Sequence, residues 1–358
     1  MIRVLHILAA MNDGGVEQMI MNYFSVIDRE IVQFDFIVHS QKTGMLEQVA
    51  KSMGACIYHV PPKTRNVFLY VKEMKRIMRE GHYDVVHCHQ GNKSVYPLII
   101  AKKANIPNRI AHAHSAIPAD TMSQKFVKRM ETHFTAENAT LLLACSQMAG
   151  DNVWKGKEYQ ILRDAVDFHK FEFSEEKRET LRKELGIVNK SVVICVARMV
   201  PSKNHKRLLE IIAKMQRDDA DIALLLVGSG GLEENIRELV DSLGVKDVIF
   251  AGSRTNVEDY LSAGDIFVLP TMHEGFGMAF LEAQLNGLEI VTTDVVSKEV
   301  RLSDKLHVLP LSATDDEWIS EIYRYLNSDR KTKFDRAVSE YDIELQGKRL
   351  MDIYCQHN

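Results

Sequence analysis

The stretch IFVLPTMHEGFGMAFLEAQLNG, from Ile266 to Gly287, predicts a strand, a turn and a helix in succession. Its first four residues form a short apolar run, which is typical of a strand covered on both faces. After a proline, Gly275-Phe276-Gly277 predicts a turn. The residues from Met278 onward have strong helical propensity, and Gly287 is suited to the position just beyond the helix C-cap. The stretch is one β/α unit.

The same alternation of short apolar runs and amphipathic stretches extends along the chain. In the first half the expected strands are Val4–Leu8, Phe34–Val38, Cys56–Val60, Val85–His89, Arg109–Ala113 and Leu141–Ala144. A second series comprises Val192–Val196, Ala223–Val227, Val248–Phe250, Ile266–Leu269 and Ile290–Thr292. Two successive series predict an α/β protein with two doubly wound, Rossmann-like domains that face each other across a cleft. The join is expected near 162–173, and 343–354 is expected to be a terminal helix.

Composition places the chain among soluble globular proteins. It has 358 residues, 46% of them apolar and 26% charged, and no apolar run approaches membrane-spanning length. The N-terminus lacks a signal-peptide pattern, and five scattered cysteines favour reduced thiols and a cytoplasmic location. Residues 1–163 carry 20 Lys and Arg against 14 Asp and Glu, whereas the remainder carries 25 against 35. This asymmetry suggests that the first half faces something anionic, or that the charges form a solvated surface.

Ligands of doubly wound sheets bind at the carboxyl ends of the strands, so residues that follow the strands are the site candidates. After the first strand, Gly14-Gly15 precedes a helix and could cradle a phosphate or a sugar, although an ordinary turn fits equally well. The G-x-G-x-x-G dinucleotide pattern is absent. The two His-x-His pairs, His87/His89 and His112/His114, each lie on one strand face and raise a metal hypothesis. With no obvious third ligand nearby in sequence we expect no metal, and we expect His114 to bind a polar ligand.

The second series places two cations after its first strand. Arg198 leaves a buried strand and Lys203 stands five residues later, at the start of a helix. A guanidinium fork, an ammonium and a helix N-terminus together suit a diphosphate. A surface pair of basic residues is the alternative. The next two strand ends carry the glycine turns of Gly228 and Gly252 to Arg254, whose backbone could approach a flat base.

Glu274 and Glu282 could be an acid and a base, metal ligands, or a clamp for hydroxyl groups. Glu274 lies in the loop and Glu282 in the second turn of the helix. At 100° per residue they are about 80° apart around a shared axis, which argues against a dyad sharing one proton. We expect each to accept hydrogen bonds from ligand hydroxyls. The free N–H groups of Gly275 to Gly277 are expected to face an anion.

In this order the motifs resemble the retaining glycosyltransferases of family four, which have the GT-B fold. The resemblance covers nearly the whole chain. The chain looks most similar to bacterial members that build capsular or extracellular polysaccharide. It implies that the terminal helix returns to the first domain, giving domains of 1–165 with 343–358 (acceptor side) and 166–342 (nucleotide-sugar side). One departure is Arg163-Asp164-Ala165-Val166-Asp167, where such proteins often carry Asn-Gly-Val-Asp. We assign Asp164 no role on this basis.

The resemblance also implies a role for each matching residue. Arg198 and Lys203 should hold the diphosphate, Glu282 the ribose and Glu274 the donor sugar, while His114 and Gly14-Gly15 should close on the sugar and phosphates. Gly228, Arg254 and the turn containing Phe276 and Gly277 complete the expected nucleotide-binding set. Positive groups would stabilise the departing diphosphate without a cofactor or metal, and the anomeric configuration would be retained by same-face attack. Domain closure would exclude water.

The expected substrates are a nucleotide-sugar, with UDP favoured, and a saccharide acceptor, with a lipid-linked one favoured; no nucleic acid is expected. A UDP-sugar epimerase or hydrolase of the same fold, or a non-catalytic nucleotide-sugar-binding subunit, are the alternatives. A metal-dependent site at Asp219-Ala220-Asp221 is not expected, because this motif precedes its strand. The basic amphipathic segment Ser123–Met130 could place the first domain on anionic lipid at the inner face of the cell membrane, although a domain-packing helix is an alternative.

Overall fold

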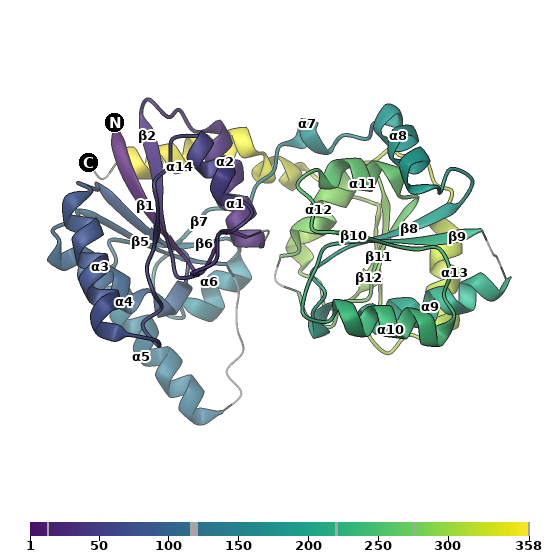
Figure 1. Ribbon diagram of the computed structural model, residues 1–358, viewed down its shortest axis with the longest axis horizontal. Coiled ribbons are helices and arrows are strands. Elements are labelled where there is room, and N and C mark those ends of the chain that lie inside the picture. Colours follow the sequence, from purple (N-terminus) through teal and green to yellow (C-terminus); the bar gives the residue numbers. More distant parts are fainter. Residues whose placement is uncertain (13, 115–120, 219–220, 275, 357–358) are drawn as a thin grey trace. The chain divides into compact units, whose positions relative to one another are not determined.

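The computed structural model describes residues 1–12, 14–114, 121–218, 221–274 and 276–356. The chain divides into two compact units (Figure 1). Unit 1 comprises Met1–Val166 and Ser339–Asn358, and unit 2 comprises Asp167–Val338. The sequence had suggested boundaries at 165/166 and 342/343. Each unit is described separately below.

The described part of unit 1 contains a seven-stranded parallel sheet in the order β3-β2-β1-β4-β5-β6-β7. Its strands are β1 (Ile2–Leu8), β2 (Val32–Val38), β3 (Ile57–His59), β4 (Val85–Cys88), β5 (Asn108–Ala113), β6 (Leu141–Ala144) and β7 (Gln160–Ile161). The strand order reverses between β1 and β4, where a doubly wound sheet binds its ligands. Loops that follow these two strands therefore border the expected site.

Helices cover both faces of this sheet (Figure 1). They are α1 (Gly15–Val26), α2 (Glu47–Ser52), α3 (Val67–Glu80), α4 (Val95–Lys103), α5 (Met122–Asn138), α6 (Gln147–Val153) and α14 (Ile343–Cys355). One core cluster joins alternate residues of β1 and β2 to α1 and α14, and the other joins the opposite strand faces to α3 and α4. Alternation along strands buried on both sides produces these two clusters.

The described part of unit 2 contains a six-stranded parallel sheet in the order β10-β9-β8-β11-β12-β13. Its strands are β8 (Ser191–Val196), β9 (Ile222–Val227), β10 (Val248–Gly252), β11 (Ile266–Leu269), β12 (Glu289–Thr293) and β13 (Leu306–Leu309). Its helices are α7 (Phe168–Phe171), α8 (Glu175–Leu185), α9 (His205–Asp218), α10 (Glu233–Leu243), α11 (Val257–Ala263), α12 (Met278–Leu285) and α13 (Asp315–Tyr325). The order reverses between β8 and β11.

The prediction of an α/β protein with two doubly wound parallel sheets is confirmed. The sequence missed β7 and β13, the outer strands of their sheets. β7 is only two residues long, and all four residues of β13 are half-buried, so neither gives a continuous apolar signal. The terminal helix α14 lies in unit 1, where Tyr354 is fully buried in the core. Within the described residues, no helix is both long enough and apolar enough to span a membrane.

Candidate functional site

Hydrogen bonds fix the strand-end loops of unit 2 to one another. The Met199 N–H, after β8, donates to the Ser229 carbonyl at 2.9 Å, and the hydroxyls of Ser229 and Ser253 lie 2.8 Å apart after β9 and β10. After β11, the Met272 N–H and the Thr271 hydroxyl donate to the Ser202 carbonyl at 2.7 and 3.0 Å. Four neighbouring loops are thereby held at the carboxyl edge of the sheet, where the predicted site residues lie.

Arg198 and Lys203 differ in their surroundings. Arg198 is exposed, and within the described residues its guanidinium has no hydrogen bond or ion pair. Lys203 ends the short 3-10 turn Pro201–Lys203, and α9 begins two residues later. Asn204 between them has a φ of 52°. Lys203 therefore lies just before the helix, near the helix start predicted for it, and Arg198 has a charge open to a ligand.

The Lys203 ammonium forms an ion pair with the Glu274 carboxylate, and both side chains are largely buried. The sequence had suggested separate tasks for these residues, one on the diphosphate and one on the sugar. Their contact depends on the bonds from β11 to Ser202, because these bring the loop after β11 next to the 3-10 turn. The two opposite charges hold each other at the strand ends, so each determines where the other points.

The turn before α12 requires glycine at Gly277. This residue has a φ of +85°, and a Cβ atom would lie 2.6 Å from Phe280 and 3.0 Å from Glu274. Both features exclude a larger residue, because L side chains rarely adopt this backbone and both contacts are too close. Phe276 is buried, whereas Gly275 falls outside the described residues. Gly287 has a φ of +77° and follows the C-cap Asn286, as predicted.

Glu282 lies apart from the Lys203–Glu274 pair, among different neighbours. Its carboxyl has no hydrogen bond to a described residue, and its charged neighbours are Lys170 and Glu258. Burial raises the pKa of this carboxyl to about 7; Glu258 adds to the shift and Lys170 opposes it. Lys170 Nζ lies 3.6 Å from Glu258. Neither neighbour was predicted from the sequence, although Glu258 lies in the helix that follows β10, where residues after a strand are site candidates.

Gly228 and Arg254 have local structural reasons for their positions. Gly228 has a φ of +126°, and a Cβ atom would lie 2.2 Å from the Ala197 carbonyl oxygen. The Arg254 Nε–H donates to the Ala251 carbonyl at 2.7 Å, and its guanidinium lies 5.5 Å from the centre of the Tyr260 ring. These contacts bring two strand-end turns close together, which is compatible with a bound base and does not require one.

In unit 1, Gly14 and Gly15 open α1, as the sequence predicted. Gly14 is the N-cap, and a Cβ atom there would lie 2.3 Å from a Glu17 carboxylate oxygen. Gly15 has no atom within 4 Å of such a position. The Glu17 carboxylate lies close to the first glycine, and open space remains beside the second. Glu17 was not singled out from sequence, although an acidic residue in a first helical turn is a common N-terminal feature.

The four histidines of the His-x-His pairs come together with His6 of β1. His87 and His89 stack with ring centroids 4.2 Å apart, and His112 and His114 are 4.0 Å apart. Burial lowers the pKa of His6 to about 3 and the pKa of His87, His89 and His112 well below the usual value, so these four are neutral. His6 could not be found from motif spacing, because sheet pairing sets it beside His87.

Cys145 and Asp164 also lie near His114. His114 Nδ1, a Cys145 sulfur and an Asp164 oxygen lie within 4.8 Å of one another, as do ligand atoms of His89, His112 and His114. The expectation of no nearby third ligand is therefore wrong in space. Cys145 follows β6, which pairs with β5, and Asp164 follows β7, the next strand in the sheet. These histidines, Cys145 and Asp164 offer the donor atoms of a metal site. The contacts of His89 with His6 and with His114 nevertheless have hydrogen-bond distances.

A pocket of about 580 Å³ in unit 1 is lined by His89, His114 and the N-terminal half of α5. The α5 residues are Ser123, Gln124, Val127, Lys128 and Glu131. The remaining lining comes from Val16, Val153 and Gln90 to Lys93. This pocket adjoins the predicted site residue His114 and leads toward the segment singled out for lipid contact.

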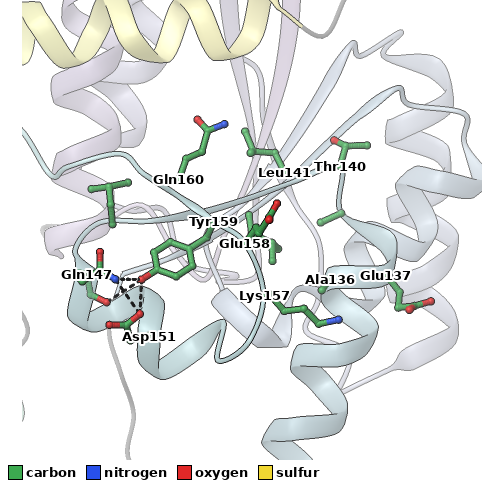
Figure 2. Close-up of a pocket in the computed structure, with 13 residues that line it drawn as sticks. Ala136, Glu137, Thr140, Leu141, Gln147, Asp151, Lys157, Glu158, Tyr159 and Gln160 are labelled. Carbon is green, nitrogen blue, oxygen red and sulfur yellow. Dashed lines mark hydrogen bonds between the residues drawn. The ribbon is translucent and has the colours of Figure 1, made fainter.

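A second hollow in unit 1, of about 820 Å³, lies at the β7 edge of the sheet and contains no predicted site residue (Figure 2). Tyr159 crosses it, and its hydroxyl donates to Asp151 at 2.6 Å. Hydrogen bonding to Tyr159 and Gln147 lowers the pKa of the Asp151 carboxyl. The side chains of Gln147, Asp151 and Tyr159 bond to one another (Figure 2), which suits a structural role.

Two family models match consecutive parts of the chain. Residues 13–161 match "Glycosyltransferase Family 4", and residues 177–332 match "Glycosyl transferases group 1". The chain is 27% identical to EpsF of Bacillus subtilis, which is named a glycosyltransferase, over 98% of this chain and 96% of that protein. It is 24% identical to CapH of Staphylococcus aureus, a capsular polysaccharide biosynthesis glycosyltransferase, over 99% of each protein.

A third relative is the UDP-Gal:alpha-D-GlcNAc-diphosphoundecaprenol alpha-1,3-galactosyltransferase of Escherichia coli. It is 24% identical over 99% of this chain and 96% of its own length. Among solved structures, HepE of Anabaena in complex with UDP-glucose superposes with a TM-score of 0.81 at 17% identity. The superposition covers 99% of this chain and all of that one, and it shows a shared fold.

Proposed function

The chain is a glycosyltransferase of family four with the GT-B fold, and from this premise we propose that it transfers a sugar from a UDP-sugar to a lipid-linked saccharide with retention of configuration. Unit 2 binds the donor, and unit 1 binds the acceptor. The observation that carries the proposal is the arrangement of Arg198, Lys203, Glu274 and Glu282 at the carboxyl edge of one doubly wound sheet.

The donor contacts follow from the charges of unit 2. Arg198 has an exposed guanidinium with no hydrogen bond or ion pair to the part of the chain that the structure describes, and it binds the diphosphate as a fork. Lys203 adds a point charge, and its ion pair with Glu274 fixes where the ammonium lies. Glu274 in turn accepts hydrogen bonds from the sugar. Glu282 accepts hydrogen bonds from the ribose hydroxyls. The ribose hydroxyls donate these bonds and so favour the ionised form of the Glu282 carboxyl. Nucleotide binding therefore lowers the pKa of this carboxyl, which burial has raised.

The chemical step needs stabilisation of the leaving group. Cleavage of the sugar–phosphate bond leaves negative charge on the nucleoside diphosphate and positive character on the sugar. Arg198 and Lys203 stabilise that charge from fixed positions, with no metal in the proposed mechanism. Loss of one preorganised group of this kind costs about 10²- to 10³-fold in rate. The departing phosphate accepts the proton of the acceptor hydroxyl on the same face, which retains the configuration.

The relatives support the choice of substrates. The Escherichia coli relative is named for a UDP-galactose donor and a diphosphoundecaprenol-linked acceptor, and HepE is bound to UDP-glucose. The pocket of about 580 Å³ beside His114 is a suitable place for a saccharide acceptor in unit 1. We assign the acceptor to this pocket because polar side chains and backbone line one end and α5 lines the other.

Helix α5 gives unit 1 a surface suited to an anionic membrane. Its residues Met122, Phe126, Met130 and Phe134 recur every four positions and are 80%, 65%, 38% and 45% exposed. Lys125, Lys128 and Arg129 accompany this stripe. Its C-terminal half packs on the unit through Thr132 and Thr135, and its N-terminal half projects (Figure 1). An apolar stripe with cations beside it lies in the lipid headgroup region, where a lipid-linked acceptor is presented.

Two measurements test this function. A thermal-shift panel of UDP, GDP, ADP and dTDP reports which nucleotide stabilises the protein by binding, and UDP should give the largest shift. Radiolabelled UDP-sugars are then incubated with an extract of lipid-linked saccharides, with and without the acceptor. Transfer that needs the acceptor supports the proposal. Rapid donor turnover without an acceptor would instead indicate a hydrolase or an epimerase.

A further inference from the structure

Three histidines of unit 1, two of them buried, form a hydrogen-bonded chain. His6 Nδ1 lies 2.9 Å from His89 Nε2, and His89 Nδ1 lies 3.0 Å from His114 Nε2. Each of these gaps needs one proton between its two nitrogens. A neutral imidazole has one N–H and one lone pair, so with all three rings neutral the chain has two self-consistent arrangements: all three protons on Nδ1, or all three on Nε2.

Asp164 distinguishes the two arrangements. His114 Nδ1 lies 3.6 Å from Asp164 Oδ1, and neither atom has a hydrogen-bond partner within the described residues. This distance is too long for a hydrogen bond. A carboxylate at this distance nevertheless repels a lone pair and attracts an N–H dipole, and burial of both atoms strengthens the effect. The His114 proton is therefore favoured on Nδ1, which makes its Nε2 the acceptor for His89.

The far end of the chain favours the same arrangement. His6 Nε2 is buried with no hydrogen-bond partner within the described residues. The ring packs against Phe34 and Phe36 of β2, at centroid distances of 4.2 and 5.5 Å. With all protons on Nδ1, this buried nitrogen carries a lone pair instead of an N–H group. The reverse arrangement would bury an unpaired N–H there and direct a lone pair at Asp164, and both changes are unfavourable.

We propose that Asp164 is a positioning residue that fixes the Nδ1–H tautomer of His114 and, through it, those of His89 and His6. His89 and His114 both line the pocket of about 580 Å³. A chain with one arrangement of protons holds both rings in one orientation in that wall. The consequence for catalysis rests on the proposed function, whereas the tautomers themselves are independent of it.

Two other uses of the chain fit the geometry less well. A proton relay needs an exit, and the chain ends at His6 Nε2, which is buried with no hydrogen-bond partner within the described residues. A metal ion needs free lone pairs on its ligands, and both nitrogens of His89 lie at hydrogen-bond distance from a neighbouring ring. The hollow among the rings is only about 10 Å³, which is at the lower limit for one water molecule.

A second chain on the same sheet face provides an internal control. His112 Nδ1 lies 3.3 Å from His87 Nε2, and His87 Nδ1 lies 2.7 Å from the Tyr354 hydroxyl. This chain ends on a tyrosine of α14 instead of on Asp164. Asp164→Asn should therefore alter the first chain and leave His87 and His112 unchanged, whereas Tyr354→Phe should do the reverse.

The experiment uses the full chain with ¹⁵N-labelled histidine. Long-range ¹H–¹⁵N spectra distinguish protonated from unprotonated ring nitrogens, and single His→Gln variants assign the signals. In the wild type, His6, His89 and His114 are expected as Nδ1–H tautomers. In Asp164→Asn the amide can donate to His114 Nδ1, so His114 is expected to change to the Nε2–H form. Asp164→Ala, which removes both the charge and the donor, should give a mixture of forms in all three rings.

A His114 ring with its proton on Nε2 in the wild type would overturn the proposal, as would unchanged spectra in Asp164→Asn. Stoichiometric zinc in the purified protein would also overturn it. With a UDP-sugar and acceptor, Asp164→Asn should lower kcat by about 10- to 100-fold, as expected for loss of an orienting group, with the donor KM changed less than about twofold. If the wild type shows no transfer, the proposed function fails while the spectra still decide the tautomers.

Discussion

The ammonium of Lys203 and the carboxylate of Glu274 form a largely buried ion pair at the carboxyl edge of the second sheet. The pair joins the loop after β8 to the loop after β11, on either side of the point where strand order reverses. Because the two charges are partners, removal of one takes away the ion-pair partner of the other. We therefore expect the pair to behave as one unit.

Variants of this pair are expected to be non-additive. Lys203→Ala and Glu274→Ala should each lower kcat by about 10²- to 10³-fold, because each removes a preorganised group and misdirects the other. The double variant should be much less impaired than the product of the two effects, with a coupling energy of about 1 to 3 kcal/mol. Steady-state kinetics of the four proteins measure the cycle. Independent effects would show that the pair does not act as a unit.

Arg198→Ala is expected to weaken UDP binding by about 10- to 200-fold, since a charge-assisted hydrogen bond contributes roughly 1.5 to 3 kcal/mol. Arg198→Lys should bind UDP more weakly than the wild type and more tightly than Arg198→Ala, because an ammonium keeps the charge and loses the fork of the guanidinium. Isothermal titration calorimetry with UDP and with uridine shows whether the lost affinity depends on the diphosphate, which uridine lacks. A matched control is Arg237→Ala, which removes an exposed arginine paired with Glu233 on α10. Equal losses of uridine and UDP affinity would place Arg198 away from the diphosphate.

UDP affinity should rise with pH across about pH 7, because burial raises the pKa of Glu282 to about 7 and ribose binding requires its ionised form. Titrations at pH 6, 7 and 8, in buffers of different ionisation enthalpy, should show proton release on binding below pH 7. In Glu282→Gln the affinity should be lower and this pH dependence absent. If the variant kept the wild-type dependence, another group would be responsible.

The same carboxyl has a predictable effect on stability. Its folded-state pKa is above its ordinary value of 4.5, so its contribution to the free energy of unfolding is fully present below about pH 4.5 and is lost as pH rises through about 7. Wild type should therefore lose stability relative to Glu282→Gln over this interval, on the order of 1 to 3 kcal/mol. Urea unfolding of both proteins at pH 5 and pH 8 measures the difference. A constant difference between the two proteins would refute the assignment.

Gly228→Ala should lower the free energy of unfolding by roughly 1 to 3 kcal/mol, because the Cβ atom would meet the Ala197 carbonyl and the backbone has a positive φ. Gly231→Ala is the matched control, since no atom lies within 4 Å of the corresponding position and its φ is not in the positive range. Urea unfolding compares the two. A loss of UDP affinity in Gly228→Ala without a loss of stability would instead support direct ligand contact.

Phe126→Glu and Met130→Glu should each reduce sedimentation with vesicles that contain phosphatidylglycerol, because each places a negative charge on the exposed stripe of α5. Transfer to a water-soluble acceptor analogue should remain unchanged. Phe334→Glu in unit 2 is the control, since Phe334 is 41% exposed and lies outside α5. Binding that persists in both α5 variants would exclude this helix as the lipid contact.

Local patterns in the sequence determined the two β/α series, the strand ends and most candidate site residues. Short apolar runs are strands covered on both faces, and the residues after them lie at one edge because all strands in each sheet are parallel. Gly277 and Gly287 could be placed from sequence because their positive φ angles are local requirements. The outer strands β7 and β13 could not, since they are too short or too exposed to show the pattern.

Only the tertiary structure decided which of these residues meet. Lys203 and Glu274 are 71 residues apart and form a pair because β8 and β11 are neighbours in the sheet. His6, His89 and His114 form a chain with Asp164 at its end for the same reason: β1, β4 and β5 lie side by side. Spacing along the chain contains no record of strand order, so sequence alone could name the groups and only the fold could assign their partners.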